Sequence, residues 1–298
     1  MRCTLLGGML IFLAASGWAQ PVIDILQLQY QYQYPSVLQD SRSEQSSLVY
    51  FASQANIPLR TKNQSIWLLN PHVEQRTFEV LSSRYRDFRP FQLKQVRSYS
   101  MNTSYQFNLS DTSKSITLLG QLRHNASTDA GITISAIRPG FAVLYGLKRN
   151  ESLSWKFGLY YARQFFGNFW LPLLGIDWRN GRWWCWGVLP RYAVIDFRIH
   201  KYWHTGIAYR GVNDSYALGN QDWMALFEGQ ARWFQDFYIP RSRLVLTAEI
   251  GHTLGRTLRG FDAGATEEIR TETANNLIFR AGISYRFTVN KKFENGDD

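Results

Sequence analysis

The chain has 298 residues, a formal net charge of +10, 15% aromatic residues and two cysteines. Its basic residues are scattered, with no basic helix, zinc-finger spacing or RNA-binding aromatic motif, so we expect no nucleic-acid partner. The charge fits anionic lipid headgroups better. No long apolar run follows the N-terminal segment, which excludes a transmembrane helix but not a barrel, whose strands need only about 10 alternating residues each.

Residues 1–19 predict a secretory signal peptide. Met1 and Arg2 precede an apolar run from Leu5 to Ala15, and Ser16-Gly17-Trp18-Ala19 follows. This order of charged start, short apolar core and small residues predicts cleavage after Ala19, and the run is too short to span a bilayer. The mature part, one domain over residues 20–298, would keep only Cys185 and therefore form no intrachain disulfide.

The first predicted strand, Leu26–Tyr34, alternates leucine and tyrosine with four glutamines, which suits a strand between lipid and a wet lumen. Pro35 is expected to end it. Further strands are predicted near 47–59, 65–80, 99–109, 116–123, 132–146 and 153–161, across 165–190, and at 193–199, 205–210, 227–237, 244–250 and 277–287. Longer loops are predicted at 36–45, 82–97, 212–222 and 254–275.

Short and long connections alternate along the chain, and Trp and Tyr are abundant enough to form girdles at both membrane interfaces. We therefore expect an all-β fold: a transmembrane antiparallel up-and-down β-barrel of about 12–14 strands, monomeric, with both termini on the periplasmic side. The alternative is a secreted, aromatic-rich sandwich. The expected location is the outer membrane of a Gram-negative bacterium, in contact with its lipid.

Ten charged side chains fall on the predicted inward faces, mostly in the C-terminal half. They are Lys156, Asp196, Arg198, Arg210, Glu228, Arg232, Asp236, Glu249, Arg280 and Arg286. In a narrow barrel they would pair into a plug, and in a wider one they would line a pore that favours anions. Barrels of 12–14 strands lie between the filled and the open sizes, so both alternatives remain.

The closing strand, Leu277 to Phe287, ends in a recognisable pattern. Arg280 is followed by Gly282, and then by Tyr285 and Phe287. These residues resemble the C-terminal β-signal of bacterial outer-membrane barrels, which implies the barrel assembly machinery as a partner.

Residues 167–191 read GNFWLPLLGIDWRNGRWWCWGVLPR, with Asn180-Gly181 as a hairpin turn. Trp178, Trp183, Trp184 and Trp186 surround this turn, as a periplasmic girdle or, less simply, as an aromatic ligand platform. Asp177 is expected to be a structural acceptor, with a site role as the alternative. Cys185 between the tryptophans is expected to be an inert packed thiol.

The same segment resembles a family of uncharacterised outer-membrane barrels common in Bacteroidota, catalogued as domain of unknown function 6268. The resemblance rests on Asn168, Pro172, Gly175, Asp177, Trp178, Gly187 and Pro190 and on the order of the strands from about residue 25 to residue 287. It implies a barrel fold and an outer-membrane location, and no activity.

Catalysis is not expected. The five histidines form no His-x-Ser pattern, no Gly-x-Ser-x-Gly elbow is present, and His200 and His204 flank a turn without an HExxH motif. We therefore predict no catalytic residues, metal or cofactor. The expected function is a passive pore or small-solute transport barrel. The alternatives are a structural or surface-interaction barrel with a plugged lumen and, last, a lipid-modifying enzyme assembled from distant strands.

Overall fold

The computed structural model describes residues 22–288 except 39–40, 61–64, 82–87, 92–94, 110, 112, 132 and 265, so the expected signal peptide lies outside the described residues. The strands are β1 (Val22–Leu38), β2 (Ser41–Ala55), β3 (Ile57–Arg60), β4 (Ile66–Leu81), β5 (Gln95–Asn108), β6 (Lys114–Ser127), β7 (Ile137–Asn150), β8 (Leu153–Gln164), β9 (Gly167–Asn180), β10 (Trp183–Leu189), β11 (Tyr192–His200), β12 (Trp203–Gly219), β13 (Asp222–Tyr238), β14 (Leu244–Asp262), β15 (Glu267–Thr273) and β16 (Leu277–Thr288). Three short 3-10 helices, η1 (Arg89–Phe91), η2 (Thr128–Ala130) and η3 (Ile134–Ala136), lie between strands. Within these ranges no helix is long and apolar enough to cross a bilayer.

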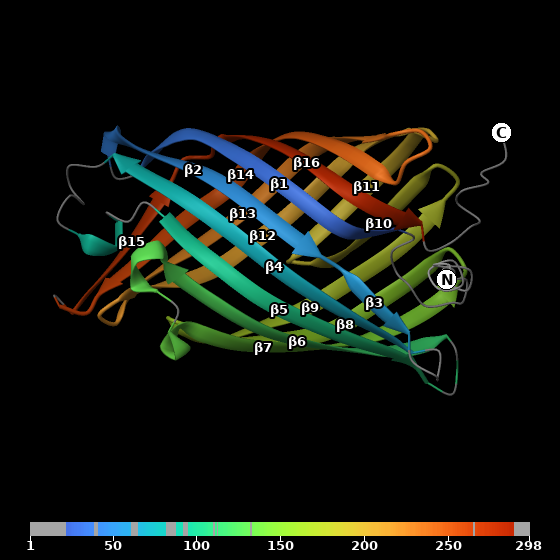
Figure 1. Cartoon of the computed structure of the whole chain (residues 1–298), viewed down its shortest axis with the longest axis horizontal. Coiled ribbons are helices and arrows are strands. Elements are labelled where there is room, and N and C mark those ends of the chain that lie inside the picture. The colour runs from blue at the N-terminus through green and yellow to red at the C-terminus, as the bar shows by residue number, and fades with distance from the viewer. Residues whose placement is uncertain are drawn as a thin grey trace, which may run out of the picture.

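The strands form one antiparallel up-and-down sheet that closes on itself (Figure 1). Closure is between the first and last strands, with Val22 of β1 opposite Thr288 of β16. β3 continues β2 along β4, and β15 and β16 pair with successive parts of β14. The sixteen described strands therefore occupy fourteen positions around a barrel, which confirms the predicted fold. An even number brings the start of β1 and the end of β16 to the same rim.

The polarity of the wall follows the strand period over most of the barrel's length. On β1, Leu26, Leu28 and Tyr30 are exposed on the outside, whereas Gln31 and Gln33 are buried inside. The closing strand has the same arrangement. Alternating side chains point to opposite faces, so the exposed apolar belt faces lipid and the polar face lines the lumen.

The polarity inverts toward the rim far from the termini. On β4, Val73 is exposed outside, but Phe78 further along is buried inside. On β13, Trp233 is exposed outside, while Leu226 and Met224 are buried inside. Apolar side chains that point inward leave the outer surface to polar groups, as in a soluble barrel. This end of the barrel therefore lies beyond the apolar belt.

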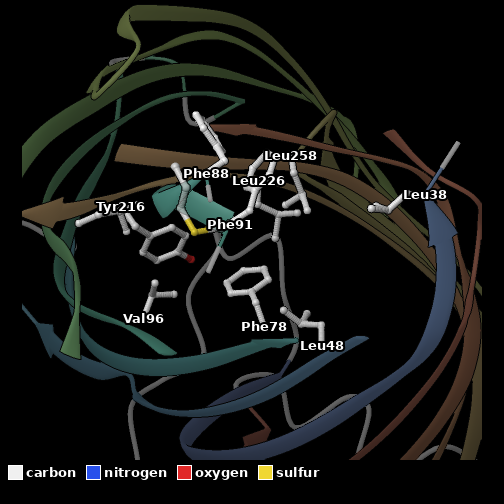
Figure 2. Close-up of a cluster of buried hydrophobic side chains, with 11 residues drawn as sticks. Leu38, Leu48, Phe78, Phe88, Phe91, Val96, Tyr216, Leu226 and Leu258 are labelled. Carbon is white, nitrogen blue, oxygen red and sulfur yellow. The ribbon is translucent and has the colours of Figure 1, made fainter. Parts of the chain in front are cut away.

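The inverted faces meet in an apolar cluster, hereafter the apolar closure, that fills the lumen at this end (Figure 2). Its buried members are Leu38, Leu48, Phe78, Phe88, Phe91, Val96, Tyr216, Leu218, Met224, Leu226 and Leu258. Phe88 and Phe91, beside and within η1, pack inside the ring in contact with each other, at a ring-centroid distance of 5.0 Å. None of these residues comes from β7 to β11.

The ring around the apolar closure is narrower than the barrel because β12 crosses toward β6. Ala217 of β12 pairs in parallel with Ala126 of β6, and the Asn125 side chain donates to the Ser215 carbonyl at 2.9 Å. The outer ends of β7, β8 and β9 therefore lie outside this narrower ring, with β12 between them and the apolar closure. β10 and β11, with only 7 and 9 residues, stop short of this level.

Three of the predicted loops are wrong in extent. β1 passes through Pro35 to Leu38 and β2 begins at Ser41, so residues 36–45 are mostly strand. β12 and β13 leave only residues 220–221 as a turn between them. β14 and β15 likewise cover most of residues 254–275. Each stretch belongs to the inverted end, where polar residues face outward and imitate loop composition. The loop predicted at 82–97 lies partly outside the described residues.

Candidate transport lumen

A cavity of about 1740 Å³ occupies the barrel between the termini-bearing rim and the apolar closure. At that rim it is lined by residues of the turns that follow β9, β11 and β13, including Arg182, Lys201 and Arg241. At its other end it is bounded by Glu74 and Asp214, beneath the apolar closure. Among the described residues, the lumen is thus a deep vestibule that opens at the termini-bearing rim, on the expected periplasmic side, and is filled at its other end.

All ten sequence-predicted lumen charges line this cavity. Several pair with neighbours along the wall. Arg232 Nε lies 3.1 Å from Glu249 Oε2, and Arg280 lies 3.7 Å from the same oxygen. Arg286 bridges Asp24 at 2.6 Å and Asp236 at 2.7 Å. These pairs tie β13, β14, β16 and β1 together and leave the centre of the barrel free.

Two more predicted acids are held by neighbouring strands. Glu228 accepts from Arg256 Nε at 2.5 Å and from Gln33 Nε2 at 2.9 Å. Asp196 lies 3.1 Å from Nδ1 of His204 on β12. Arg198 also has an interaction with another residue. Most of the predicted charges are therefore part of the wall and do not form a central plug.

A layer of charges that sequence reasoning missed does cross the lumen. Arg76 of β4 donates to Asp214 of β12 at 2.7 Å, and Arg123 of β6 contacts the same carboxylate. Glu74 lies 3.2 Å from Arg76 and accepts from the Tyr216 hydroxyl at 3.4 Å. This ionic layer lies directly beneath the apolar closure. Asp214 was missed because residues 212–222 were interpreted as a loop.

The wall opposite the paired charges is apolar. Ala142, Leu144, Leu173 and Val188 form a second buried cluster, with Leu119, Tyr160, Leu171 and Tyr192 packed against it. All of them point inward from β6 to β11. The lumen therefore offers an apolar surface on one side and a charged surface on the other.

A ladder of amides connects the two surfaces. Asn70 donates to Asn56 at 2.9 Å, Asn102 to Asn70 at 2.8 Å, and Gln121 to Asn102 at 2.7 Å. The Tyr160 hydroxyl completes the ladder by donating to Gln121 Oε1 at 2.9 Å, passing over Gly140 of the intervening strand. The ladder spans six neighbouring positions of the wall and fixes inward side chains from five of them.

Beyond the turns at the mouth, three cations of the cavity have no ion pair with a described residue. Lys156 lies on β8, Arg191 at the tip of the β10–β11 hairpin, and Arg210 on β12 opposite Tyr192. Of all the described residues that line the cavity, twelve are Lys or Arg and seven are Asp or Glu, an excess of five positive charges. Such a lining attracts anions, most strongly where water is scarce.

The tryptophans around Asn180-Gly181 divide between the two faces, which corrects the interpretation as a simple girdle. Trp178 and Trp183 are exposed on the outside. Trp184 and Trp186 line the lumen side and stack with ring centroids 3.7 Å apart. Trp184 Nε1 donates to the buried Asp177 at 3.0 Å, so Asp177 has a structural contact here. The half-buried Cys185 lies between the two inward tryptophans in sequence and points the opposite way.

The residues that carry the family resemblance fold into the β9–β10 hairpin. Asn168, near the outer end of β9, accepts from the Tyr161 hydroxyl at 2.9 Å. Pro172 points outward, and Gly175 points inward, where an added Cβ would lie 2.9 Å from Lys156 Cβ. Gly187 has no room for a side chain against Ala193, and Pro190 forms the hairpin tip.

The residues of the expected β-signal lie on β16, which pairs with β1 and closes the barrel. Arg280 points into the lumen, and Gly282 lies opposite Gln29. Tyr285 and Phe287 point outward, with ring centroids 5.2 Å apart. Arg243 lies 3.9 Å above the Phe287 ring.

One histidine of the lumen has a serine and a carboxylate near it. His72 Nδ1 is 3.5 Å from Ser100 Oγ, and His72 Nε2 is 3.9 Å from Glu74. A nucleophile and its base normally lie within about 2.6–3.2 Å, and here the carboxylate is bound by Arg76. The described residues hold no group of three potential metal ligands.

No protein-family model matches the chain, and no curated protein matches its sequence. Solved structures with a similar arrangement include the COG4313 outer membrane channel from Pseudomonas putida F1, at 6% identity, with a TM-score of 0.47 and coverage of 88% of this chain and 94% of that chain. The KdgM porin in complex with disordered oligogalacturonate is 10% identical, with a TM-score of 0.36 and coverage of 88% and 99%. The Pseudomonas putida toluene transporter TodX is 9% identical, with a TM-score of 0.40 and coverage of 88% of each chain.

The chain's own geometry defines its class. It has an even number of antiparallel positions, an exposed apolar belt, outward aromatic residues and a polar lumen. These are the features of an outer-membrane β-barrel. The protein is an integral β-barrel of this class, with a charged lumen.

Proposed function

We propose that this barrel transports small solutes across the outer membrane and that its lumen favours anions. The observation that carries the proposal is the 1740 Å³ cavity with its excess of positive charge. A barrel used only as a scaffold has no need of such a vestibule. Ion pairs along the wall keep the positive groups in place while Lys156, Arg191 and Arg210 remain available to a solute.

The plugged alternative accounts for only one end of the lumen. The ionic layer and the apolar closure cross the barrel there, but the larger part of the lumen remains a cavity. A closure at one end of a vestibule is an arrangement suited to a gate. We therefore expect the resting protein to conduct little and to conduct steadily once the closure is loosened.

A planar-bilayer recording tests the proposal. The wild type is compared with a Phe88→Ala/Phe91→Ala variant, which removes two rings from the apolar closure. We expect steady, anion-selective conductance from the variant only. Phe157→Ala/Phe279→Ala, which changes two exposed outward rings, is the matched control and should behave as the wild type. A folded closure variant that stays silent, or that prefers cations, would refute the transport proposal.

We also propose the route by which the barrel reaches the membrane. Residues 1–19 would direct export, with cleavage after Ala19, and Arg280, Gly282, Tyr285 and Phe287 would be the signal for the barrel assembly machinery. The β9–β10 motif supports membership of the uncharacterised Bacteroidota family. We expect a monomer without enzymatic activity. Mass spectrometry of the N-terminus of the membrane-inserted protein tests the cleavage site.

A further inference from the structure

The barrel wall is incomplete between β9 and β12. β10 pairs with β9 only from Leu174 onward, so residues 167–173 pair with β8 alone. β11 pairs with β12 only as far as Arg210, so beyond it β12 pairs with β13 and, at Ala217, with β6. Two strand edges thus face each other above the β10–β11 tip without a strand between them. We call this break the seam.

Few hydrogen bonds cross the seam, and they lie at its ends. At the hairpin tip, the Gly211 amide donates to the Arg191 carbonyl at 2.8 Å. At the outer end, the Phe165 amide donates to Ser215 Oγ at 3.1 Å. Elsewhere in the wall a lateral opening would break a ladder of backbone bonds, whereas here it would break almost none. Bare strand edges do not face lipid, so the seam must border a cavity or be covered by side chains.

The cavity does reach the seam. Its lining includes Phe169 and Leu171 on the β9 edge, Arg191 at the tip, and Gly211 and Asn213 on the β12 edge. Asn213 Oδ1 is buried and has no hydrogen-bond partner among the described atoms. An unsatisfied buried acceptor at a cavity wall is a place where a ligand or water gains a contact.

We place the seam at the level of the outer membrane leaflet because an exposed aromatic group lies beside it, far from the termini-bearing rim. Trp170, within the β9 edge, is exposed outward beside Tyr161 and Phe141, at ring-centroid distances of 4.6 and 6.3 Å. Such aromatic groups mark the membrane interface. The straight route past this level is filled by the ionic layer and the apolar closure, both built without β7 to β11.

The lining on the two sides of the seam selects a type of solute. The inward apolar cluster of β6 to β11 ends at Leu171 and Tyr192, beside the tip. Arg191 and Arg210, neither with an ion pair to a described residue, stand at the same level. An apolar tail would lie on this cluster while a single negative head meets the two guanidinium groups. Arginine forms paired hydrogen bonds with carboxylate and phosphate oxygens, and a sulfonate offers the same kind of anionic oxygens.

We propose that the seam is a lateral gate through which amphipathic monoanions pass between the lumen and the outer leaflet. This inference rests on the transport function proposed above and names its route and substrate class. The lumen would then have two exits. Polar anions would leave past the apolar closure once it moves, whereas tailed anions would leave sideways through the seam beneath the closure.

Blocking the seam tests the gate. In a Cys185→Ser background, Asn213→Cys is modified with benzyl methanethiosulfonate, and octanesulfonate uptake into proteoliposomes is measured. We expect at least a fivefold loss of uptake on modification and full recovery with dithiothreitol. Gln29→Cys, which also lines the cavity but on β1, is the matched control and should lose little. Independently, Arg191→Glu should lower octanesulfonate uptake and raise that of octyltrimethylammonium.

Methanesulfonate separates this inference from the transport proposal. In the Phe88→Ala/Phe91→Ala background its uptake should persist after Asn213→Cys is modified, because the opened closure offers another path. If that uptake occurs but complete modification leaves octanesulfonate uptake unchanged, the lateral gate is wrong and transport stands. If the opened variant takes up no methanesulfonate, the transport proposal fails and the gate with it.

Discussion

Glu228 illustrates at the residue scale how the lumen wall holds a charge. It accepts from Arg256 at 2.5 Å, from Gln33 at 2.9 Å and from Gln230, with the two ionic side chains 1% and 0% exposed. Removing one partner of such a pair leaves a buried charge and costs about 3 kcal/mol. We expect Arg256→Leu to lower the free energy of unfolding by about that amount, measured by urea unfolding in lipid vesicles through tryptophan fluorescence.

A surface pair supplies the control for this change. Arg270 and Glu272 lie 2.9 Å apart but are 64% and 46% exposed. Solvent screens such pairs, which contribute about 0–1 kcal/mol, so Arg270→Leu should have little effect. Equal losses for Arg256→Leu and Arg270→Leu would mean that the Glu228 pair is not shielded as the structure has it.

The amide ladder depends on one missing side chain. A Cβ on Gly140 would lie 3.2 Å from the Tyr160 hydroxyl and 3.2 Å from the Tyr161 carbonyl. Gly140→Val should push Tyr160 away from Gln121 and destabilise the barrel by roughly 1–3 kcal/mol, the usual cost of overpacking. Gly229→Val is the control, since its nearest contact would be an ordinary 3.4 Å. The urea midpoints of the two variants should therefore differ, and matching midpoints would contradict the ladder.

The sequence predicts which charged residues lie on the inward face, but it does not predict which of them form ion pairs with one another. The strand period alone put Arg232, Glu249 and Arg280 inside, because alternate residues share a face. Arg76 and Asp214 meet only because β12 crosses toward β6, a contact between strands that are far apart in the sheet order. No local pattern encodes such a crossing. The ionic layer was therefore beyond prediction even where its residues were visible.

At the scale of elements, the inversion of polarity explains which strands were recognised. Below the inversion, exposed aliphatic and aromatic residues alternate with polar ones, and the strands were identified. Above it, the apolar residues turn inward, as Leu258 and Leu226 do, and charges such as Arg259 face out. A search for outward apolar residues therefore does not recognise the strands above the inversion, because their outer face meets water and is polar. The short β10–β11 pair, by contrast, follows from the Asn180-Gly181 turn and the nearby Pro190.

The placement of η1 in the apolar closure depends on a glycine of β14. A Cβ on Gly260 would lie 2.7 Å from the Phe88 ring and 2.8 Å from Pro90. Gly260→Val should therefore displace η1 and loosen the closure without removing an aromatic ring. We expect steady conductance in planar bilayers where the wild type has little. Gly229→Val, on the adjacent strand, should remain closed, and a silent Gly260→Val barrel would show that η1 does not hold the closure.

At the scale of the whole molecule, the class of barrel has a direct physical consequence. Its backbone bonds close around a ring, so unfolding in detergent is slow without heat. We expect the mature protein to require detergent for solubility and to migrate faster on gels before boiling than after. A chain that is soluble without detergent and shows one mobility would contradict the lipid-facing belt.

Ion selectivity is the property in which the charges of the whole lumen act together. The pairs along the wall mean that different arginines contribute differently to it. Removing Lys156 and Arg191, which have no ion pair with a described residue, lowers the excess of positive charge and should leave the wall intact. Removing Arg232 and Arg280 instead leaves Glu249 without its partners. This change lowers the positive charge of the lumen and also weakens the wall.

We therefore expect two distinct outcomes in the Phe88→Ala/Phe91→Ala background. Lys156→Gln/Arg191→Gln should move the anion-to-cation permeability ratio toward unity with an unchanged urea midpoint. Arg232→Ser/Arg280→Ser should move the ratio further, because an uncompensated carboxylate then faces the path, and should lower the midpoint. Reversal potentials in a salt gradient measure the ratio. If Lys156→Gln/Arg191→Gln leaves the permeability ratio unchanged, the paired charges of the wall would set the selectivity. Lys156 and Arg191 would then act only on the tailed anions at the seam.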